Sequence, residues 1–142
     1  MSVKDADALI LVKAARSMIG CPFLLHGRNP ATGLDCVGLV AACLSATGRE
    51  PLVPDGYALR NHSIERWIHC AKRSGLEPVS TSPEPGDIVM TSPAASQHHL
   101  MVVEHGRRAI HAHAGLRRVV SEPLPDRFDP IIQWRLSPRK GI

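Results

Sequence analysis

The sequence predicts an α+β fold in which helices from the N-terminal half pack on an antiparallel sheet from the C-terminal half. Two observations support this prediction. Up to about residue 75, apolar side chains recur at helical spacing. After the proline-rich segment 80–85, they fall in short runs bounded by Gly and Pro, which is typical of strands. Helices first and strands second favour α+β over an alternating α/β arrangement.

Size and composition indicate one globular domain. The chain has 142 residues, and we expect a single domain over 1–142. Hydrophobic residues make up 44% and charged residues 21%, which is ordinary for a globular protein. No apolar run has the length of a membrane span. Acidic residues precede the first apolar run, unlike a secretory signal, so we expect synthesis in the cytoplasm without a signal peptide.

The N-terminal half contains two predicted helices that flank the segment containing Cys36. A run rich in Ala, Leu, Ile and Val predicts a helix over about 3–19, which Pro22 prevents from continuing. Residues 20–35 hold several Gly and Pro residues, and we expect a long loop that forms the wall of a functional site. Ser63 is expected to begin a later helix that Gly75 ends.

Between these helices lies a third helical pattern that carries a cysteine at its first position. Six residues fall on one helix face: Cys36, Leu39, Val40, Cys43, Leu44 and Thr47. The pattern predicts a helix over about 36–47, with Asp35 as its N-cap and Gly48 at its end. The N–H groups and dipole of a helix N-terminus favour a thiolate at Cys36. The alternative is that Cys36 is a small buried hydrophobic residue.

The C-terminal half combines predicted strands with histidines. Short apolar runs predict strands at 87–91, 100–104, 109–114, 119–120 and 131–136. Five of the eight histidines also lie here: His98, His99, His105, His111 and His113. A cysteine nucleophile needs an imidazole to take its proton and a polar group to hold that imidazole. A sheet packed on the cysteine helix can present both.

The remaining composition argues against several kinds of site. The four cysteines lack C-x-x-C spacing, so we expect reduced thiols, with Cys21, Cys43 and Cys70 in packing roles. Close-set histidines can bind zinc, but few acidic ligands accompany them, so we expect no metal and no other cofactor. The net charge of +4 comes from scattered arginines, aromatic residues are 4%, and no nucleic-acid motif is present. We therefore expect no nucleic-acid partner.

Five blocks follow one another along the chain: Gly20-Cys21-Pro22-Phe23, Asp35-Cys36-Val37-Gly38-Leu39-Val40, Pro85-Gly86-Asp87-Ile88-Val89, His99-Leu100-Met101-Val102-Val103 and Ile110-His111-Ala112. Together, and in this order, they resemble the NlpC-type cell-wall cysteine peptidases. The resemblance implies a papain-like fold and cleavage of peptidoglycan stem peptides next to D-glutamate, without a cofactor. The short chain looks like the branch encoded in phage and gene-transfer-agent tail clusters. That branch implies phage-like tail proteins as partners and action at the cell wall within such a particle.

The resemblance assigns roles residue by residue. Cys36 matches the nucleophile, His99 the general base and His111 the third, orienting residue. Asp35 matches the acid before the cysteine, which contacts the amino end of the substrate. The cleft is expected to be walled by residues 21–34, by the 51–61 loop and by the loop before His98.

Two positions depart from the family pattern, and two arginines are further candidates. Phe23 stands where a tyrosine commonly supplies an oxyanion hydroxyl, and Val37 stands where a serine commonly follows the cysteine. Both replacements fall at expected substrate-binding positions. Arg28 and Arg60 are candidates to meet carboxylates of the stem peptide, with simple surface solvation as the alternative for each.

The strand pattern restricts which histidines can lie on the same face of the sheet. His98 competes with His99 as base, but alternation along a strand places them on opposite faces, so only one is expected to face the cysteine. A two-residue turn would also place His99 and His111 on opposite faces. We therefore expect a loop with an odd number of residues, or a bulge, near 105–108.

Two other functions fit the same residues. One is a non-catalytic tail-tip or cell-wall-binding protein on this fold, which Phe23 and Val37 favour and the intact cysteine and histidines disfavour. The other is a thiol amidase or acyltransferase that acts on another substrate, because a fold does not fix its substrate.

Overall fold

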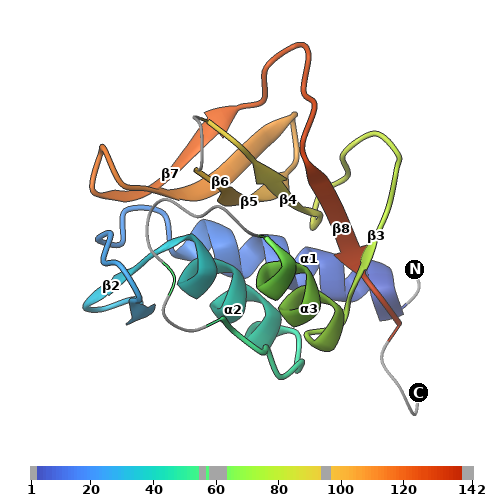
Figure 1. Ribbon diagram of the computed structural model, residues 1–142, viewed down its shortest axis with the longest axis horizontal. Coiled ribbons are helices and arrows are strands. Elements are labelled where there is room, and N and C mark those ends of the chain that lie inside the picture. Colours follow the sequence, from blue (N-terminus) through green and yellow to red (C-terminus); the bar gives the residue numbers. More distant parts are fainter. Residues whose placement is uncertain (1–2, 55–56, 58–63, 94–96, 139–142) are drawn as a thin grey trace.

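The computed structural model describes residues 3–54, 57, 64–93 and 97–138. Within these residues it contains three helices and a six-stranded antiparallel sheet. The helices form one layer and the sheet the other, as Figure 1 shows. The architecture is therefore α+β, as the sequence predicts.

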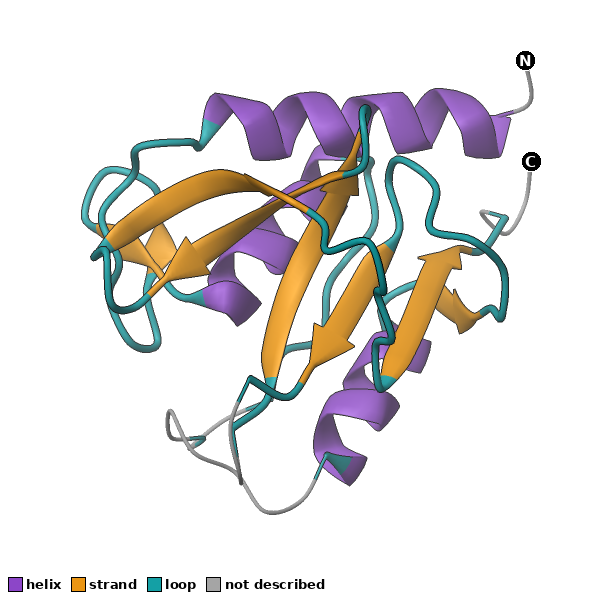
Figure 2. Cartoon of the chain, turned by 90° about the horizontal axis from the view of Figure 1, so that it is seen from above, coloured by secondary structure: helices purple, strands orange, loops and turns teal. Residues whose placement is uncertain are grey.

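The helices agree closely with the sequence pattern. They are α1 (Val3–Ser17), α2 (Cys36–Ala46) and α3 (Glu65–Arg73). Helix α1 ends two residues before the predicted limit, and Gly20 follows in a left-handed conformation. Ser63, the expected cap of α3, lies outside the described residues. Seen from above, α1 runs along one side of the molecule, with α2 and α3 partly hidden behind the sheet (Figure 2).

The sheet contains every predicted strand and one that was not predicted. Its order is β3-β8-β4-β5-β6-β7. The bounds are β3 Leu76–Pro78, β4 Ile88–Thr91, β5 His99–Glu104, β6 Arg108–His113, β7 Arg118–Pro123 and β8 Ile132–Leu136. Strand β3 was missed because three residues ending in a proline show no alternation; a proline is tolerated there since β3 is an edge strand. Two short strands, β1 (Arg28–Asn29) and β2 (Gly33–Leu34), form a separate ribbon inside the 20–35 loop.

The connection between β5 and β6 has the odd length that the histidines require. Glu104 pairs with Arg108, which leaves a loop of three residues, 105–107. Gly106 and Arg107 both have positive φ, of 76° and 55°, which is usual for three-residue hairpin loops. The expected odd loop is confirmed, and it places His99 and His111 on the same face of the sheet.

Helix α2 lies at the centre of the core. It packs against α1 and against strands β5 and β6, and eight of its eleven residues are buried. A helix that is apolar all round is a buried helix. The main core fills the space between the helices and the sheet, and a smaller cluster that includes Val89, Val103 and Ala109 covers the other face. Cys36 is therefore built into a rigid interior element.

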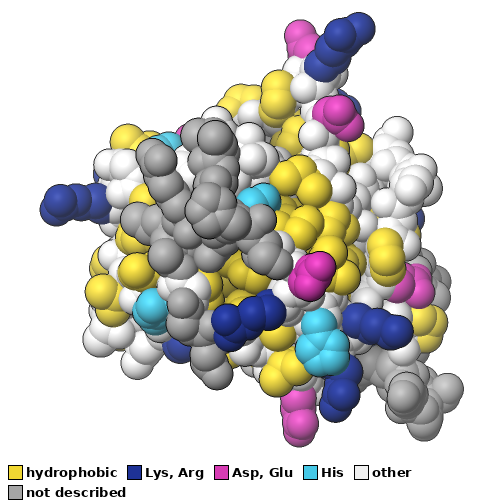
Figure 3. All heavy atoms as spheres, in the orientation of Figure 1, with side chains coloured by type: hydrophobic (Ala, Val, Ile, Leu, Met, Phe, Trp, Pro, Cys, Tyr) yellow, Lys and Arg dark blue, Asp and Glu magenta, His cyan; other side chains and the backbone are white. Residues whose placement is uncertain are grey.

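Charged side chains are dispersed on the face seen in Figure 3. Lys and Arg lie apart from one another there, while hydrophobic side chains gather in the middle, between the sheet and the helices. On this face the basic residues do not form the continuous patch by which nucleic-acid-binding proteins are recognised.

The loop before α2 approaches the helix so closely that two glycines are needed. A Cβ at Gly38 would lie 2.0 Å from the carbonyl oxygen of Gly27, and a Cβ at Gly27 would lie 2.2 Å from the carbonyl oxygen of Gly33. Both contacts are with backbone atoms, which cannot rotate away as a side chain can. The loop is therefore held directly against the first turn of α2.

We predict that Gly38→Ala destabilises the protein by about 1–3 kcal/mol, because the new methyl group overlaps the Gly27 carbonyl. Alanine is the better helix former, so an unconstrained site would instead gain stability. The exposed Ser45→Ala in the same helix is the control, with a change of at most about 0.5 kcal/mol expected. Urea unfolding of both variants measures the difference, and a stabilised Gly38→Ala would contradict the close approach.

Candidate active site

A pocket of about 350 Å³ lies where β5 begins and β6 ends, beside the N-terminus of α2. Cys36, His99 and His111 all line it. The three wall segments expected from the sequence also contribute, through Phe23, Tyr57 and Gln97. The structure thus brings the three predicted catalytic residues to one cavity, large enough for a segment of a small peptide.

The Cys36 thiol is held in a dry environment beside β5. Burial raises the pKa of Cys36 to about 12; the backbone N–H of Leu100 opposes this rise, while the charge of Asp35 adds to it. The backbone N–H groups of Cys36 and Val37 at the helix N-terminus do lower the pKa, as expected, but desolvation outweighs them, so the thiol is the favoured form in the free protein. All four cysteines of the chain are free thiols.

The two predicted catalytic histidines are joined to each other. His99 Nε2 lies 2.8 Å from His111 Nδ1, and the rings meet edge to face with centroids 4.9 Å apart. Burial, together with the charges of His111 and His113, lowers the pKa of His99 to about 3. Burial also lowers the pKa of His111, against the opposing effect of Glu122. Both imidazoles are therefore neutral at pH 7.

His98 lies in the same pocket as His99 but is bonded differently. Strand β5 begins at His99, so His98 precedes the alternating part of the chain, and both residues line the cavity. That only one of the two rings faces Cys36 stays a prediction. The Nδ1 atom of His98 is buried without a hydrogen-bond partner among the described residues. His99, not His98, has the hydrogen bond to His111 that orients a base.

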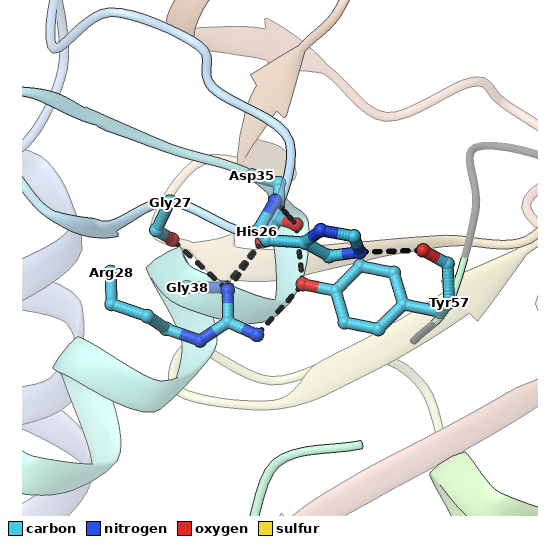
Figure 4. A network of polar contacts seen from close by, with 6 residues as sticks. All are labelled: His26, Gly27, Arg28, Asp35, Gly38 and Tyr57. Atoms are coloured by element: carbon cyan, nitrogen blue, oxygen red, sulfur yellow. Dashed lines mark hydrogen bonds and ion pairs between the residues drawn. The ribbon is translucent and has the colours of Figure 1, made fainter. Parts of the chain in front are cut away.

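Asp35 lines the pocket together with Tyr57 and is the centre of a polar network (Figure 4). Its Oδ1 accepts hydrogen bonds from Gly38 N–H at 2.8 Å and Arg28 Nη1 at 3.1 Å. Its Oδ2 accepts from His26 N–H at 2.8 Å and from the Tyr57 hydroxyl. Both oxygens are thus fully used by the protein, and the side chain is buried. Asp35 is an N-cap that also fixes two loops, so its carboxylate has no vacant acceptor site for a substrate amine.

Tyr57 is the part of the site that sequence reasoning missed. Its hydroxyl donates to Asp35 and accepts from Arg28 Nη2 at 2.8 Å, and its ring packs edge-on against His26 and Trp67. Burial raises the pKa of Tyr57. The only signal available was that this is the single tyrosine of the chain. Its hydroxyl proton is donated to Asp35 and is therefore not free for a hydrogen bond to a bound molecule.

The expected substrate-binding residues lie in different places. Phe23 lines the pocket. Val37 instead points into the core and lines a separate apolar cavity of about 50 Å³, because it follows Cys36 on the inner side of α2. Arg28 is ion-paired with Asp35 and lies 5.7 Å from the centroid of the Tyr57 ring, outside the pocket lining. Arg60 lies outside the described residues.

Among the described residues, no group of three or more His, Cys, Asp or Glu side chains has the arrangement of a metal site. The described helices include none that is both long enough and apolar enough to span a bilayer.

Comparison with known proteins identifies the fold. No model of a known family and no curated protein matches the chain. Among solved structures, it is similar to the NlpC/p60 domain of the peptidoglycan hydrolase SagA, with 22% identity over 92% of this chain and 98% of that one, and a TM-score of 0.62. The chain has an NlpC/p60 fold. The NlpC-type fold predicted from the sequence is thereby confirmed.

Two further structures show the same NlpC/p60 architecture. The peptidoglycan hydrolase RipB from Mycobacterium tuberculosis is 17% identical, with 96% of this chain and 67% of that chain covered and a TM-score of 0.68. An NlpC/p60 family protein from Bacillus cereus is 20% identical over 92% of this chain, with a TM-score of 0.67. The chain spans only 40% of that longer protein.

We predict that Asp35→Asn lowers the free energy of unfolding by about 2 kcal/mol or more. The amide replaces one oxygen by an NH₂ group, which then faces N–H or O–H donors in a buried site. Urea denaturation of the variant measures the loss. Asp126→Asn, at an exposed position after β7, is the matched control, and equal effects at the two positions would show that the network does not hold the site together.

Proposed function

We propose that this protein is a cysteine peptidase that hydrolyses peptide bonds in peptidoglycan stem peptides, next to D-glutamate. Cys36 is the nucleophile, His99 the general base and His111 the orienting residue. The observation that carries this proposal is the 2.8 Å contact between His99 and His111 in the pocket that Cys36 lines. The solved NlpC/p60 structures of similar fold that are named peptidoglycan hydrolases support the substrate class.

The protonation states favour a thiol–imidazole pair that begins neutral. Because burial raises the pKa of Cys36 and lowers that of His99, a preformed thiolate–imidazolium pair is not stabilised in the free protein. The proton therefore moves from sulfur to His99 as the sulfur attacks the substrate carbonyl carbon. His99 Nε2 is engaged by His111, which leaves Nδ1 as the nitrogen that takes the proton.

The rest of the reaction follows from the same groups. The attacking sulfur forms a tetrahedral intermediate, and we assign the stabilisation of its oxyanion to backbone N–H groups at the N-terminus of α2. His99 then returns the proton to the leaving amine as the C–N bond breaks, which leaves an acyl-enzyme. Water, activated by His99, hydrolyses the thioester and regenerates the Cys36 thiol.

The pocket wall modifies this scheme. Phe23 supplies no hydroxyl, and loss of one oxyanion donor costs about a hundredfold in rate, so we infer a slow enzyme. We assign Phe23 to apolar contact with the substrate, and Asp35 and Arg28 to holding the wall in place through their ion pair. Val37 acts through core packing. We further propose that a phage-like particle delivers the protein to the cell wall, on the strength of the sequence resemblance alone.

Digestion of purified peptidoglycan tests the proposal. Wild-type protein is expected to release stem-peptide fragments, identified by mass, whereas Cys36→Ala and His99→Ala release none, because each removes a reacting group. Cys43→Ala is the matched control: this thiol lies in the same helix but outside the pocket lining, so activity should persist.

Other results would redirect the assignment. Cleavage of peptidoglycan by Cys36→Ala would show that Cys36 is not the nucleophile. Binding of peptidoglycan without cleavage, by a folded wild type, would favour a structural wall-binding protein. Hydrolysis of simple model amides but not of stem peptides would favour a thiol amidase.

The pH dependence of activity gives a second test. A general base works only when unprotonated, and the pKa of His99 is lowered to about 3. We therefore expect kcat/KM to stay high well below pH 6.5, with its acid limb below about pH 5. An acid limb centred near pH 6.5, with the fold intact, would mean that the base is an ordinary solvated histidine.

The fold must be monitored in that experiment because the same pKa shift affects stability. The unfolded chain has an ordinary histidine pKa near 6.5 and binds a proton below it, while native His99 does not. Stability is therefore complete above about pH 6.5 and falls as the pH is lowered toward the folded pKa of about 3. Circular dichroism at each pH separates unfolding from loss of catalysis.

A further inference from the structure

We propose that Glu122, on β7, is a positioning residue that selects the catalytic tautomer of His99 through His111. The catalytic consequence rests on the proposed function, but the tautomer selection itself does not. Glu122 lies on the strand next to β6, in register with Ala109, and its side chain is about half exposed. It faces the same histidines that line the pocket.

The carboxylate meets His111 on the side opposite His99. Glu122 Oε2 lies 3.3 Å from His111 Nε2, and His111 Nδ1 is the atom bonded to His99. His111 Nε2 is buried and has no aligned hydrogen-bond partner among the described residues. The carboxylate is therefore the acceptor within reach of that nitrogen, and a small rotation of the exposed Glu122 side chain aligns the bond.

Each neutral imidazole carries one proton, and the chain of contacts fixes where it lies. For His99 Nδ1 to accept the thiol proton, the proton of neutral His99 must be on Nε2, which then donates to His111 Nδ1. His111 must in turn carry its own proton on Nε2, which faces Glu122. A carboxylate accepts and cannot donate when ionised, so Glu122 favours this arrangement over its mirror.

The opposite arrangement is unproductive. With the proton of His111 on Nδ1, that nitrogen would donate to His99 Nε2, and the proton of His99 would move to Nδ1. Nδ1 would then be a donor and would have no lone pair for the thiol proton of Cys36. Without an acceptor at His111 Nε2, nothing in the described contacts distinguishes the two arrangements.

A third histidine also lies near the carboxylate. His113 Nδ1 accepts a hydrogen bond from Leu116 N–H at 3.0 Å, so neutral His113 carries its proton on Nε2. That atom lies 4.0 Å from the other oxygen of Glu122. Glu122 thus lies between ring nitrogens of two histidines on β6. The titratable groups that face His111 are then His99 on β5, His113 on β6 and Glu122 on β7.

Nitrogen NMR reads the tautomers directly. Two-bond ¹H–¹⁵N correlation spectra at pH 7.5 on ¹⁵N-histidine-labelled protein distinguish protonated from unprotonated ring nitrogens. In the wild type we expect protons on Nε2 of both His99 and His111. In Glu122→Leu we expect a population with protons on Nδ1 of both. Glu122→Gln keeps an accepting oxygen and should restore the wild-type pattern, whereas the exposed Glu50→Leu is a control without effect.

Peptidoglycan digestion by the same proteins gives the functional readout. We expect kcat/KM to fall about tenfold or more in Glu122→Leu, as for other partners that fix a histidine tautomer, and Glu122→Gln to retain most of the activity. Since Glu122 is half exposed on an edge strand, both variants are expected to fold.

The NMR and digestion experiments distinguish a failure of the Glu122 proposal from a failure of the proposed peptidase function. Tautomers that do not respond in Glu122→Leu, or a wild type with the proton of His111 on Nδ1, would overturn the role of Glu122 even if the enzyme is active. Tautomers that respond as expected, in a protein that cleaves nothing, would uphold the selection by Glu122 while the proposed peptidase activity fails.

Discussion

The carboxylate of Asp35 is the constraint on which the site depends. One side chain caps α2, receives the backbone N–H of the preceding loop and binds Arg28 and the Tyr57 hydroxyl. These groups come from three separate segments of the chain. Because a buried carboxylate is costly unless its acceptor sites are filled, the network forms as a unit. Its assembly places Cys36 directly after the cap, at the floor of the pocket.

Burial then sets the chemistry of the pocket. The same dry packing that fixes α2 in the core penalises charge, so it opposes a thiolate at Cys36 and an imidazolium at His99. The helix N-terminus is present, as the sequence indicated, but its N–H groups are the weaker influence. In the proposed mechanism, the thiol and the imidazole therefore stay neutral until a substrate binds, and charge separates only when the substrate supplies an oxyanion for the N–H groups to stabilise.

Sequence periodicity predicted the elements better than it predicted the contacts between them. The buried stripe of α2 and the short apolar runs of β4, β5, β6 and β8 were visible because burial imposes a spacing on the residues. Strand β3 was not predicted from the sequence because its pairing with β8 depends on tertiary contacts and not on alternation. Tyr57 and Glu122 were missed for the same reason, since each reaches its partners only after distant segments have packed. Val37 follows Cys36 directly in the sequence, but the geometry of the helix points its side chain into the core.

The connection between β5 and β6 is three residues long. Because His99 and His111 must share a face of the sheet, the length of this loop is constrained more than its sequence. Side chains alternate along a strand, so changing the loop by two residues leaves His99 and His111 on a common face, while changing it by one separates them. An insertion or deletion between these strands therefore keeps the two histidines on one face only if it changes the loop by an even number of residues, or if a bulge compensates for an odd change. Substitutions within the loop are limited by the left-handed backbone at Gly106 and Arg107 and by the hydrogen bond from Arg107 Nη2 to the Pro125 carbonyl oxygen. Descendants of this sequence can therefore vary the composition of the hairpin tip more readily than its length, which can change by an even number of residues or by an odd number with a compensating bulge.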